Sequence, residues 1–244
     1  MKNWHTEKIE INDTNKNFKG RVGVDELIKF FQITTFNHSQ EMGLDHESMI
    51  KNSNAFWVVT KMKLVLNKPI DCQNRISATT WTHELGGVRA IRDCVIKHKN
   101  SLIAKGSAEW CCLDIDTRRI RKLTSIQYPE LAMEKTNNLN IKFTSENIEF
   151  GQKDYVYSKI VRATDIDLNN HTNNMKYNLI ALDAFTVDEL NSFEIKEYEI
   201  HFVNESYEGD EIKVFKKKLK NNYYVLGKVD EKIVFRTYFK IKKL

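Results

Sequence analysis

The stretch Asn173-Asn-Met-Lys-Tyr-Asn-Leu-Ile-Ala-Leu-Asp-Ala-Phe185 decides the fold class of this 244-residue chain. Within it, one stripe of side chains recurs at helical spacing: Tyr177, Ile180, Ala181 and Ala184. A second set extends the apolar surface most of the way round the helix: Leu179, Leu182 and Phe185. A helix that is apolar on nearly all sides must be wrapped by other elements, and a strongly curved antiparallel sheet meets that demand.

Strand-length runs of β-branched and aromatic residues surround this helix, which we predict from about Asn173 to Glu189. One strand is predicted near Tyr155–Arg162, and the strands after the helix are predicted near 194–204, 210–220, 222–229 and 231–242. The same order occurs once before, with an extended segment at His5–Ile11 and a helix at Val24–Met42. The residues at helical spacing in that first helix are Leu27, Phe30, Phe31 and Thr34, and the strands after it are predicted near 54–66, 75–84, 87–98 and 101–113.

The polar, weakly periodic stretch Pro129–Asn147 separates the two halves and predicts a connection rather than core. We therefore expect one domain at 1–135, a linker at 136–147 and a second domain at 148–244, each of ordinary domain size. The predicted fold class is α+β, with a long central helix and a curved antiparallel sheet in each domain.

Composition restricts the function classes. Met1–Glu10 lacks a secretory pattern and no apolar run approaches the roughly 20 residues that span a bilayer, so we expect a cytoplasmic protein without a membrane span. The four cysteines form no CxxC pair, which favours reduced structural thiols at Cys72, Cys94, Cys111 and Cys112. Paired metal-ligand spacing, a glycine-rich phosphate loop and a GxSxG elbow are all missing from the sequence. We expect no metal and no cofactor.

The formal net charge is +5, and basic residues gather at Arg118–Lys122, Lys216–Lys218 and Lys240–Lys243. Two interpretations stay open for each cluster, namely a docking surface for an acidic partner and a solvated strand end. Nucleic acid is the less favoured partner, because no helix-turn-helix, zinc or aromatic RNA-binding signature accompanies the charge.

The segment Arg162-Ala-Thr-Asp-Ile-Asp167-Leu-Asn169-Asn-His171-Thr-Asn-Asn-Met-Lys-Tyr177 crowds polar side chains into a loop that leads into the apolar helix. On residue types alone, a cluster of helix caps and Asx turns is the favoured explanation, because Asp and Asn side chains bond nearby backbone amides.

The spacing Asp167-x-Asn169-x-His171-x-Asn-Asn-x-x-Tyr177 nevertheless resembles the active-site motif of the acyl-acyl carrier protein thioesterases of plants and bacteria. Further along, Tyr198-Glu-Ile-His-Phe-Val-Asn-Glu205-Ser206 is similar to the second motif of that family. Matching segments in the first half are Trp57, Thr80-Trp81, Arg92-Asp93 and Ala108-Glu-Trp110. The resemblance covers nearly the whole chain. It implies two tandem hotdog domains, the first binding the acyl chain and the second catalytic, in a monomer or homodimer.

The resemblance also implies an activity: hydrolysis of the thioester that links a fatty acyl chain to the phosphopantetheine of acyl carrier protein. The implied catalytic residues are Asp167 as nucleophile or base, Asn169 and His171 to orient it and the thioester, and Glu205 to activate water. Backbone amides at Thr172–Asn174 are expected to face the developing oxyanion. The candidate substrate-binding residues are Asn173, Asn174, Leu27 and Phe31, although loop-fixing hydrogen bonds are the simpler role for the two asparagines.

Plant members of the family commonly have cysteine after the glutamate, whereas this chain has Ser206, so a cysteine nucleophile is excluded there. Three alternatives remain at this stage. They are a hotdog thioesterase acting on coenzyme A esters, a non-catalytic acyl-binding module, and a hotdog dehydratase or hydratase.

Overall fold

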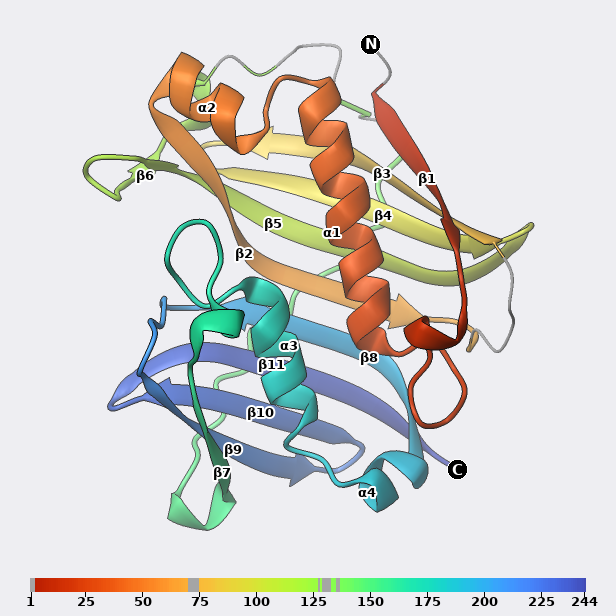
Figure 1. Cartoon of the computed structure of the whole chain (residues 1–244). Helices are drawn as coiled ribbons and strands as arrows, with labels where there is room; N and C mark the ends of the chain where they lie inside the picture. Colours follow the sequence, from red (N-terminus) through yellow and green to blue (C-terminus); the bar gives the residue numbers. More distant parts are fainter. Residues whose placement is uncertain (1–2, 70–74, 127, 129–132, 135–136) are drawn as a thin grey trace. The chain divides into compact units, whose positions relative to one another are not determined.

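The computed structural model describes residues 3–69, 75–126, 128, 133–134 and 137–244. The chain divides into two compact units, Met1–Ile141 and Lys142–Leu244, and Figure 1 shows a helix and an antiparallel sheet in each. The division falls within the predicted linker at 136–147, of which residue 136 lies outside the described ranges. The α+β fold class is confirmed.

The first unit places one long helix against a strongly paired sheet. Its sheet has the order β1-β3-β4-β5-β2, and β6 pairs with the end of β5 at Cys112 and Leu113; all these pairings are antiparallel. The elements are β1 (Trp4–Glu10), α1 (Val24–Glu41), α2 (His46–Ser53), β2 (Ala55–Leu66), β3 (Arg75–Gly86), β4 (Arg89–His98), β5 (Ser101–Asp114) and β6 (Ile120–Arg121). The predicted long strands are confirmed within a few residues, whereas α2 and β6 were not predicted.

Helix α1 crosses one face of this sheet and contacts β1 and β3 (Figure 1). The four residues predicted to share a stripe, Leu27, Phe30, Phe31 and Thr34, are all buried, so the predicted core face is confirmed. The helix begins at Val24 with acidic residues in its first turn, which suits the positive end of the helix dipole. It ends at Glu41, just before Gly43 takes a positive φ of 67°.

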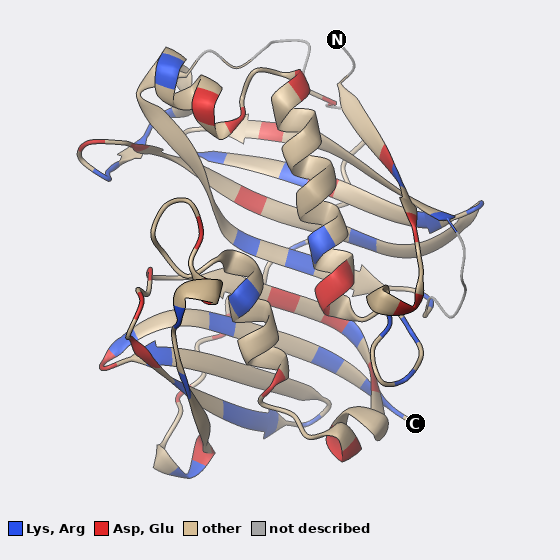
Figure 2. Ribbon diagram, in the orientation of Figure 1, with Lys and Arg blue, Asp and Glu red and all other residues tan. Residues whose placement is uncertain are grey.

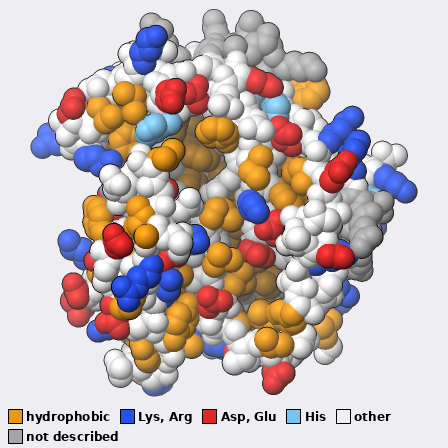
Figure 3. Space-filling model, viewed as in Figure 1, with side chains coloured by type: hydrophobic (Ala, Val, Ile, Leu, Met, Phe, Trp, Pro, Cys, Tyr) orange, Lys and Arg blue, Asp and Glu red, His pale blue; other side chains and the backbone are white. Residues whose placement is uncertain are grey.

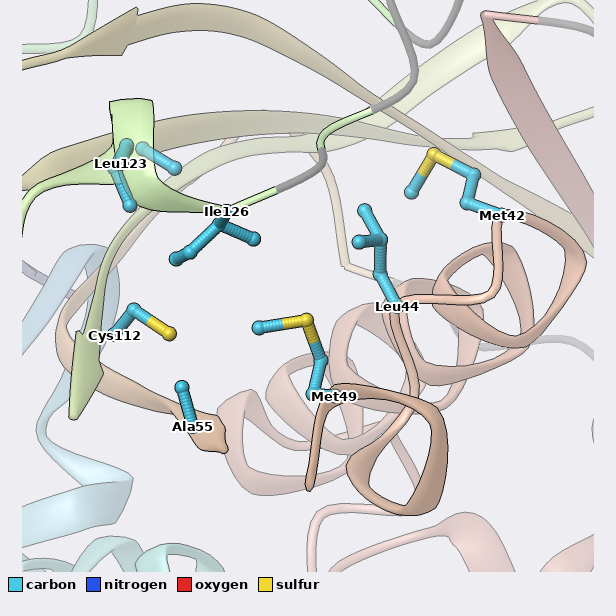
Figure 4. Packing of buried hydrophobic residues seen from close by; sticks show 8 residues of the cluster. Met42, Leu44, Met49, Ala55, Cys112, Leu123 and Ile126 are labelled. Carbon is cyan, nitrogen blue, oxygen red and sulfur yellow. The ribbon is translucent and has the colours of Figure 1, made fainter. Parts of the chain in front are cut away.

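A second group of apolar side chains closes the end of the first unit where α1 meets α2. Figure 4 shows this cluster from close by, with side chains from the connection between α1 and α2, from α2, β2, β5 and from the segment after β6 pointing toward one another. Its members are Met42, Leu44, Met49, Ala55, Ala90, Cys112, Leu123 and Ile126. Trp57, Trp110 and Tyr128 pack against it and are only partly buried. Aromatic side chains thus border the apolar cluster.

The second unit has the strand order β8-β11-β10-β9-β7, again antiparallel. Its elements are β7 (Tyr155–Ile160), α3 (Asn174–Leu182), α4 (Val187–Asn191), β8 (Phe193–Phe202), β9 (Glu211–Leu219), β10 (Asn222–Val229) and β11 (Lys232–Lys243). The predicted strands are confirmed.

The single helix predicted at 173–189 is wrong, because the structure has two helices there. Helix α3 ends at Leu182, and Thr186 caps the start of α4: its hydroxyl oxygen accepts from the Glu189 backbone N–H at 3.1 Å. The Glu189 carboxylate in turn accepts from the Thr186 backbone N–H at 2.9 Å. This reciprocal capping box is a start signal, and it outweighs the apolar periodicity that continues across it.

The expectation that the second helix is wrapped all round is also wrong. Tyr177, Ile180 and Ala181 are buried, but Leu179 is 42% exposed, so one side of α3 lies open. Nine residues form only two and a half turns, and one buried stripe suffices to hold so short a helix against the sheet.

The described cysteines Cys94, Cys111 and Cys112 are buried free thiols, whereas Cys72 lies outside the described residues. Burial raises the pKa of Cys112 to about 11, which keeps the thiol protonated at neutral pH. Over the described ranges, no helix combines the length and the apolar composition that crossing a membrane requires. Within the same part of the chain, no three His, Cys, Asp or Glu side chains are arranged to hold a metal ion.

Candidate active site

The loop before α3 is built on Asp165, a carboxylate that is only 5% exposed. Its side chain accepts from the Arg162 backbone N–H at 2.9 Å and pairs with Lys159 at 2.9 Å, and its carbonyl accepts from the Asn173 N–H at 2.8 Å. Burial alone raises the pKa of this carboxyl, but the hydrogen bonds and the charge of Lys159 outweigh it and leave the pKa below its ordinary value. Asp165 therefore anchors the loop as an anion.

Asp167 and His171 face each other across a tight turn. The Asp167 backbone N–H donates to the His171 carbonyl at 2.9 Å, and the Asp167 carboxylate accepts from the Asn169 backbone N–H at 2.8 Å. Asn170 takes a positive φ of 61° inside the turn, a conformation that asparagine tolerates. The Asn169 side chain is exposed. The turn thus has the Asp167 carboxylate at its first residue and the His171 imidazole at its fifth and last.

Glu205 joins this loop through an ion pair. The His171 Nε2 lies 3.1 Å from the Glu205 carboxylate, and the Tyr207 hydroxyl donates to the same carboxylate oxygen at 3.3 Å. The rings of His171 and Tyr207 meet edge to face with centroids 5.2 Å apart. The side chains of His171 and Glu205 are 16% and 39% exposed, so solvent reaches both. The predicted catalytic side chains of His171 and Glu205 are thus in direct contact. Asp167 is linked to His171 by the backbone hydrogen bond of the turn.

Ser206 ties the two motifs together. The Thr172 backbone N–H donates to the Ser206 carbonyl at 2.8 Å, and the hydroxyls of Thr172 and Tyr177 lie 2.7 and 2.8 Å from the Ser206 hydroxyl. Ser206 is fully buried. Its hydroxyl is therefore engaged by two neighbours and holds Glu205 at the start of α3, a role that the sequence alone did not indicate.

We expect Ser206→Ala to lower the free energy of unfolding by about 1–3 kcal/mol, because two buried hydroxyls then lose a partner. Ser192→Ala, which removes an exposed hydroxyl bonded to the Glu189 carbonyl, is the matched control and should stay within about 0.5 kcal/mol of the parent. Denaturant titration measures both. A Ser206→Ala protein as stable as the parent but inactive would make Ser206 a catalytic group instead of a structural link.

The backbone amides expected to face the oxyanion are mostly occupied. The Thr172 N–H donates to Ser206 and the Asn173 N–H donates to Asp165, so the prediction is wrong for these two groups. Asn173 caps α3, and its side-chain oxygen accepts from the Met175 N–H at 2.8 Å. The Asn174 carbonyl accepts from the Asn178 side chain at 3.0 Å. Asn174 alone of the three amides stays a candidate for the oxyanion, and the cap at Asn173 agrees with the loop-fixing role.

The first unit contains a second copy of this loop. Residues 11–24 have the same local secondary structure as residues 161–174, 150 positions later. The Asn17 N–H donates to the Arg21 carbonyl at 2.8 Å, and the Asn17 side chain accepts from the Lys19 N–H at 2.9 Å, as Asp167 does in the second unit. Gly20, with a φ of 67°, takes the place of Asn170.

The copy has none of the implied catalytic side chains. Asn17, Lys19 and Arg21 stand where the second unit has Asp167, Asn169 and His171. After β2, the amides of Asn67 and Lys68 donate to the Ile103 carbonyl. After β8, the amides of Val203 and Asn204 donate to the Val234 carbonyl in the same way, so Pro69 holds the position in the first unit that Glu205 holds in the second. Loop shape is repeated between the units and loop chemistry is not. The sequence indicates this repeat only by polar residues at similar spacing after Asn12 and after Arg162. That similarity is too weak to identify the repeat without the hydrogen bonds of the structure.

The first unit also encloses a cavity of about 180 Å³ between α1, the start of α2 and the sheet. Figure 3 shows hydrophobic side chains in a hollow on this face of the unit. Leu27 and Phe31, the predicted acyl-binding residues, are 2% and 0% exposed core residues and are not among the side chains that line the cavity. The lining comes from another side of α1, at Gln32, Thr35, Phe36 and Ser39.

Three tryptophans of the first unit's strands divide between two roles. Trp81 is buried and its indole N–H donates to the Asn137 carbonyl at 2.6 Å, as a core residue does. Trp57 and Trp110 line the cavity instead. Asp93, on β4, pairs with His83 on the neighbouring strand β3 at 3.1 Å.

Two sequence models of one family match the chain. The N-terminal domain of acyl-ACP thioesterases matches residues 2–128, and the C-terminal domain of acyl-ACP thioesterases matches residues 148–240. These ranges take in most of the 244 residues, and the chain therefore belongs to the acyl-ACP thioesterase family.

Curated relatives include a chloroplastic acyl-[acyl-carrier-protein] hydrolase of Cuphea viscosissima, 27% identical over 173 residues, which are 63% of this chain and 40% of that protein. An oleoyl-acyl carrier protein thioesterase of Arabidopsis thaliana is 22% identical over 204 residues, 77% of this chain and 55% of that protein. The chain spans about half the length of the curated relatives it matches.

Solved structures agree in fold. An acyl-ACP thioesterase from Bacteroides thetaiotaomicron matches with a TM-score of 0.87 at 20% identity, over 98% of both chains. The 12:0-ACP thioesterase from Umbellularia californica matches with a TM-score of 0.87 at 14% identity, over 100% of this chain and 99% of the other.

Proposed function

We propose that the protein hydrolyses the thioester of a fatty acyl chain carried on acyl carrier protein and releases a free fatty acid and the carrier thiol. The observation that carries the proposal is the His171–Glu205 pair, held by Ser206 against the turn that bears Asp167. We further propose that each unit is a hotdog domain, with catalysis in the second and acyl binding in the first. The chain-long likeness to solved acyl-ACP thioesterases supports that assignment.

In the proposed reaction, the carbon–sulfur bond of the thioester breaks and water supplies an oxygen to the acyl group. With Asp167 as base, water loses a proton to Asp167 and its oxygen adds directly to the thioester carbonyl carbon. With Asp167 as nucleophile, the carboxylate displaces the sulfur and forms an acyl anhydride, which water then hydrolyses. The leaving sulfur takes up a proton and departs as a thiol. Asp167 supplies the carboxylate that acts as nucleophile or base, and its backbone bond to His171 fixes the distance between the two residues. Glu205 orients the imidazole through the 3.1 Å ion pair and helps to activate water, and Asn169 orients the thioester.

Charge supports an acidic carrier as partner. Lys213 and Lys216–Lys218 colour much of β9 blue in Figure 2. Lys216 and Lys217 pair with Glu189 and Asp154, so part of this basic cluster is internally balanced. Because exposed charges are screened by salt, docking of an acidic carrier should weaken as ionic strength rises. The cytoplasmic location and the monomer or homodimer stay predictions.

One assay tests the function. The same acyl group is offered on acyl carrier protein and on coenzyme A, and free thiol is measured with a chromogenic reagent. We expect thiol release from both, faster from the carrier. A clear preference for coenzyme A would overturn the choice of carrier, and water addition to an enoyl chain without thiol release would indicate a dehydratase or hydratase. Binding without either reaction would leave an acyl-binding module.

A further inference from the structure

A positively charged side chain, that of Arg92, lines the cavity of the first unit and is buried there. Arg92 projects into it from β4 and is only 5% exposed. Aromatic and aliphatic side chains form much of the remaining wall, among them Phe36, Leu44, Trp57 and Trp110. A volume of about 180 Å³ would hold roughly a dozen water molecules, since one water needs about 10–15 Å³ of such space. The cavity is therefore large enough for a flexible aliphatic chain.

The contacts of Arg92 do not balance its charge. The guanidinium lies 2.9 Å from the His38 Nδ1 and next to the Tyr128 side chain, and neither of these neighbours is a carboxylate. Among the described residues, no carboxylate lies within ion-pair distance of Arg92. Burial lowers the pKa of Arg92, yet an arginine stays protonated in proteins. An unpaired buried charge is costly, which makes this site unusual.

The nearby carboxylates are committed elsewhere. Asp93 follows Arg92 in β4 but faces the other side of the sheet, where it pairs with His83 and accepts from the Leu139 N–H at 2.9 Å. Asp45 lines the same cavity, but its carboxylate caps α2 and accepts from the Ser48 N–H at 3.1 Å and the Ser48 hydroxyl at 2.7 Å. Neither residue neutralises the guanidinium.

Within the described part of the chain, two further polar groups of the cavity wall have no hydrogen-bond partner. Thr35, on α1 and 5% exposed, has a buried hydroxyl without a hydrogen bond, and Trp110, on β5, has a buried indole N–H without one. Buried polar atoms are nearly always satisfied, so each exception asks for an explanation. A guanidinium, a hydroxyl and an indole N–H share one property, because each can donate to an anionic oxygen.

We propose that this cavity binds an aliphatic carboxylate, with the carboxylate on Arg92 and the hydrocarbon chain along Phe36, Trp57 and Trp110. The negative carboxylate neutralises the Arg92 guanidinium, which donates hydrogen bonds to it. Such charge-assisted hydrogen bonds are stronger than those between neutral groups. A free fatty acid has this chemistry, and so does an acyl chain with a second carboxyl group at its far end. The inference concerns binding and does not rest on hydrolysis.

Binding of dodecanoate below its micellar concentration is compared with binding of dodecanol by isothermal titration calorimetry, in the Asp167→Asn background so that turnover plays no part. We expect dodecanoate to bind at least about tenfold more tightly, a preference worth about 1.4 kcal/mol. Arg92→Met should remove the preference, and Arg92→Lys should keep most of it because the charge remains. Equal binding of the two ligands to the parent, or a preference that survives in Arg92→Met, would overturn the proposal.

Folding is checked independently by circular dichroism and thermal unfolding. Arg92→Met should unfold at the same or a higher temperature than the parent without ligand, because it removes an unpaired buried charge. If that variant does not fold, Thr35→Val replaces it, with an expected loss of about threefold in dodecanoate affinity and none in dodecanol affinity; an unchanged preference there counts against the proposal.

A second arm separates the two sources of carboxylate. Turnover of a dodecanoyl thioester is measured with added dodecanoate and compared with turnover of the same thioester bearing a terminal carboxyl group. Inhibition by dodecanoate that Arg92→Met abolishes identifies the free acid as the ligand. Faster turnover of the carboxylated chain that Arg92→Met abolishes identifies the substrate tail. If the parent shows neither the inhibition nor the faster turnover, a role for the site during turnover is overturned. Binding of the carboxylate itself is decided separately, by the calorimetric comparison.

Discussion

Asp167→Asn should lower thioester hydrolysis by at least about a thousandfold while the second unit stays folded. The substitution removes the negative charge that acts as nucleophile or base and keeps the oxygen that accepts from the Asn169 N–H. The first unit supplies the reason to expect an intact loop, because Asn17 makes the same bond there at 2.9 Å. Asparagine therefore supports this turn in the same protein.

Initial rates of thiol release measure the loss, and circular dichroism with thermal unfolding checks the fold. Asn17→Asp is the matched control: it restores a carboxylate to the copy of the loop, where Arg21 and Pro69 replace the histidine and the glutamate. We expect it to leave turnover unchanged. Asp167→Ala should be as inactive as Asp167→Asn. Full activity in Asp167→Asn would remove the assigned mechanism.

Glu205→Gln and His171→Ala should each lower turnover by about a hundredfold or more, because each breaks the 3.1 Å ion pair that orients the imidazole. If the two residues act as one unit, the double variant should be no slower than the slower single variant, since groups in one network are not additive. Losses that multiply in the double variant would show that the two residues act independently.

Tyr207→Phe is the control for the second prediction. It removes the hydroxyl that donates to Glu205 at 3.3 Å and keeps the ring that packs on His171. A long hydrogen bond to an exposed carboxylate contributes little, and we expect turnover within about threefold of the parent. Loss of activity as large as in Glu205→Gln would move the catalytic role toward Tyr207.

Much of the fold could be predicted because its elements have strong local signals. Helix α1 and the long strands appear where apolar spacing and β-branched runs place them. The break between α3 and α4 was missed because the apolar pattern runs through Thr186, while the separate start of α4 depends on two hydrogen bonds between Thr186 and Glu189. The open side of α3 at Leu179 could not be predicted, because composition does not say which side of a helix faces the sheet.

The candidate site likewise has features that the sequence predicted and features that it did not. The motifs predicted that Asp167, His171 and Glu205 belong to one catalytic site, and the structure adds the ion pair between His171 and Glu205. The competition for the Thr172 and Asn173 amides was hidden, because their acceptors are the carbonyls of Ser206 and Asp165, and carbonyls carry no sequence signature. Arg92 was visible only as a charge in a strand. Its burial without a counterion depends on which neighbours share its side of the sheet.

The matching turns at Asn17 and Asp167 bear on the history of the chain. An ancestral gene for a single unit, copied end to end, would have begun with two equivalent turns, each carrying the same reactive groups. Since the hydrogen bonds that shape the turn come from the backbone and from a side-chain oxygen common to aspartate and asparagine, one copy could shed its reactive groups without unfolding. Such a copy would be open to another task, and the buried guanidinium of Arg92 in its cavity is the first feature to test for one.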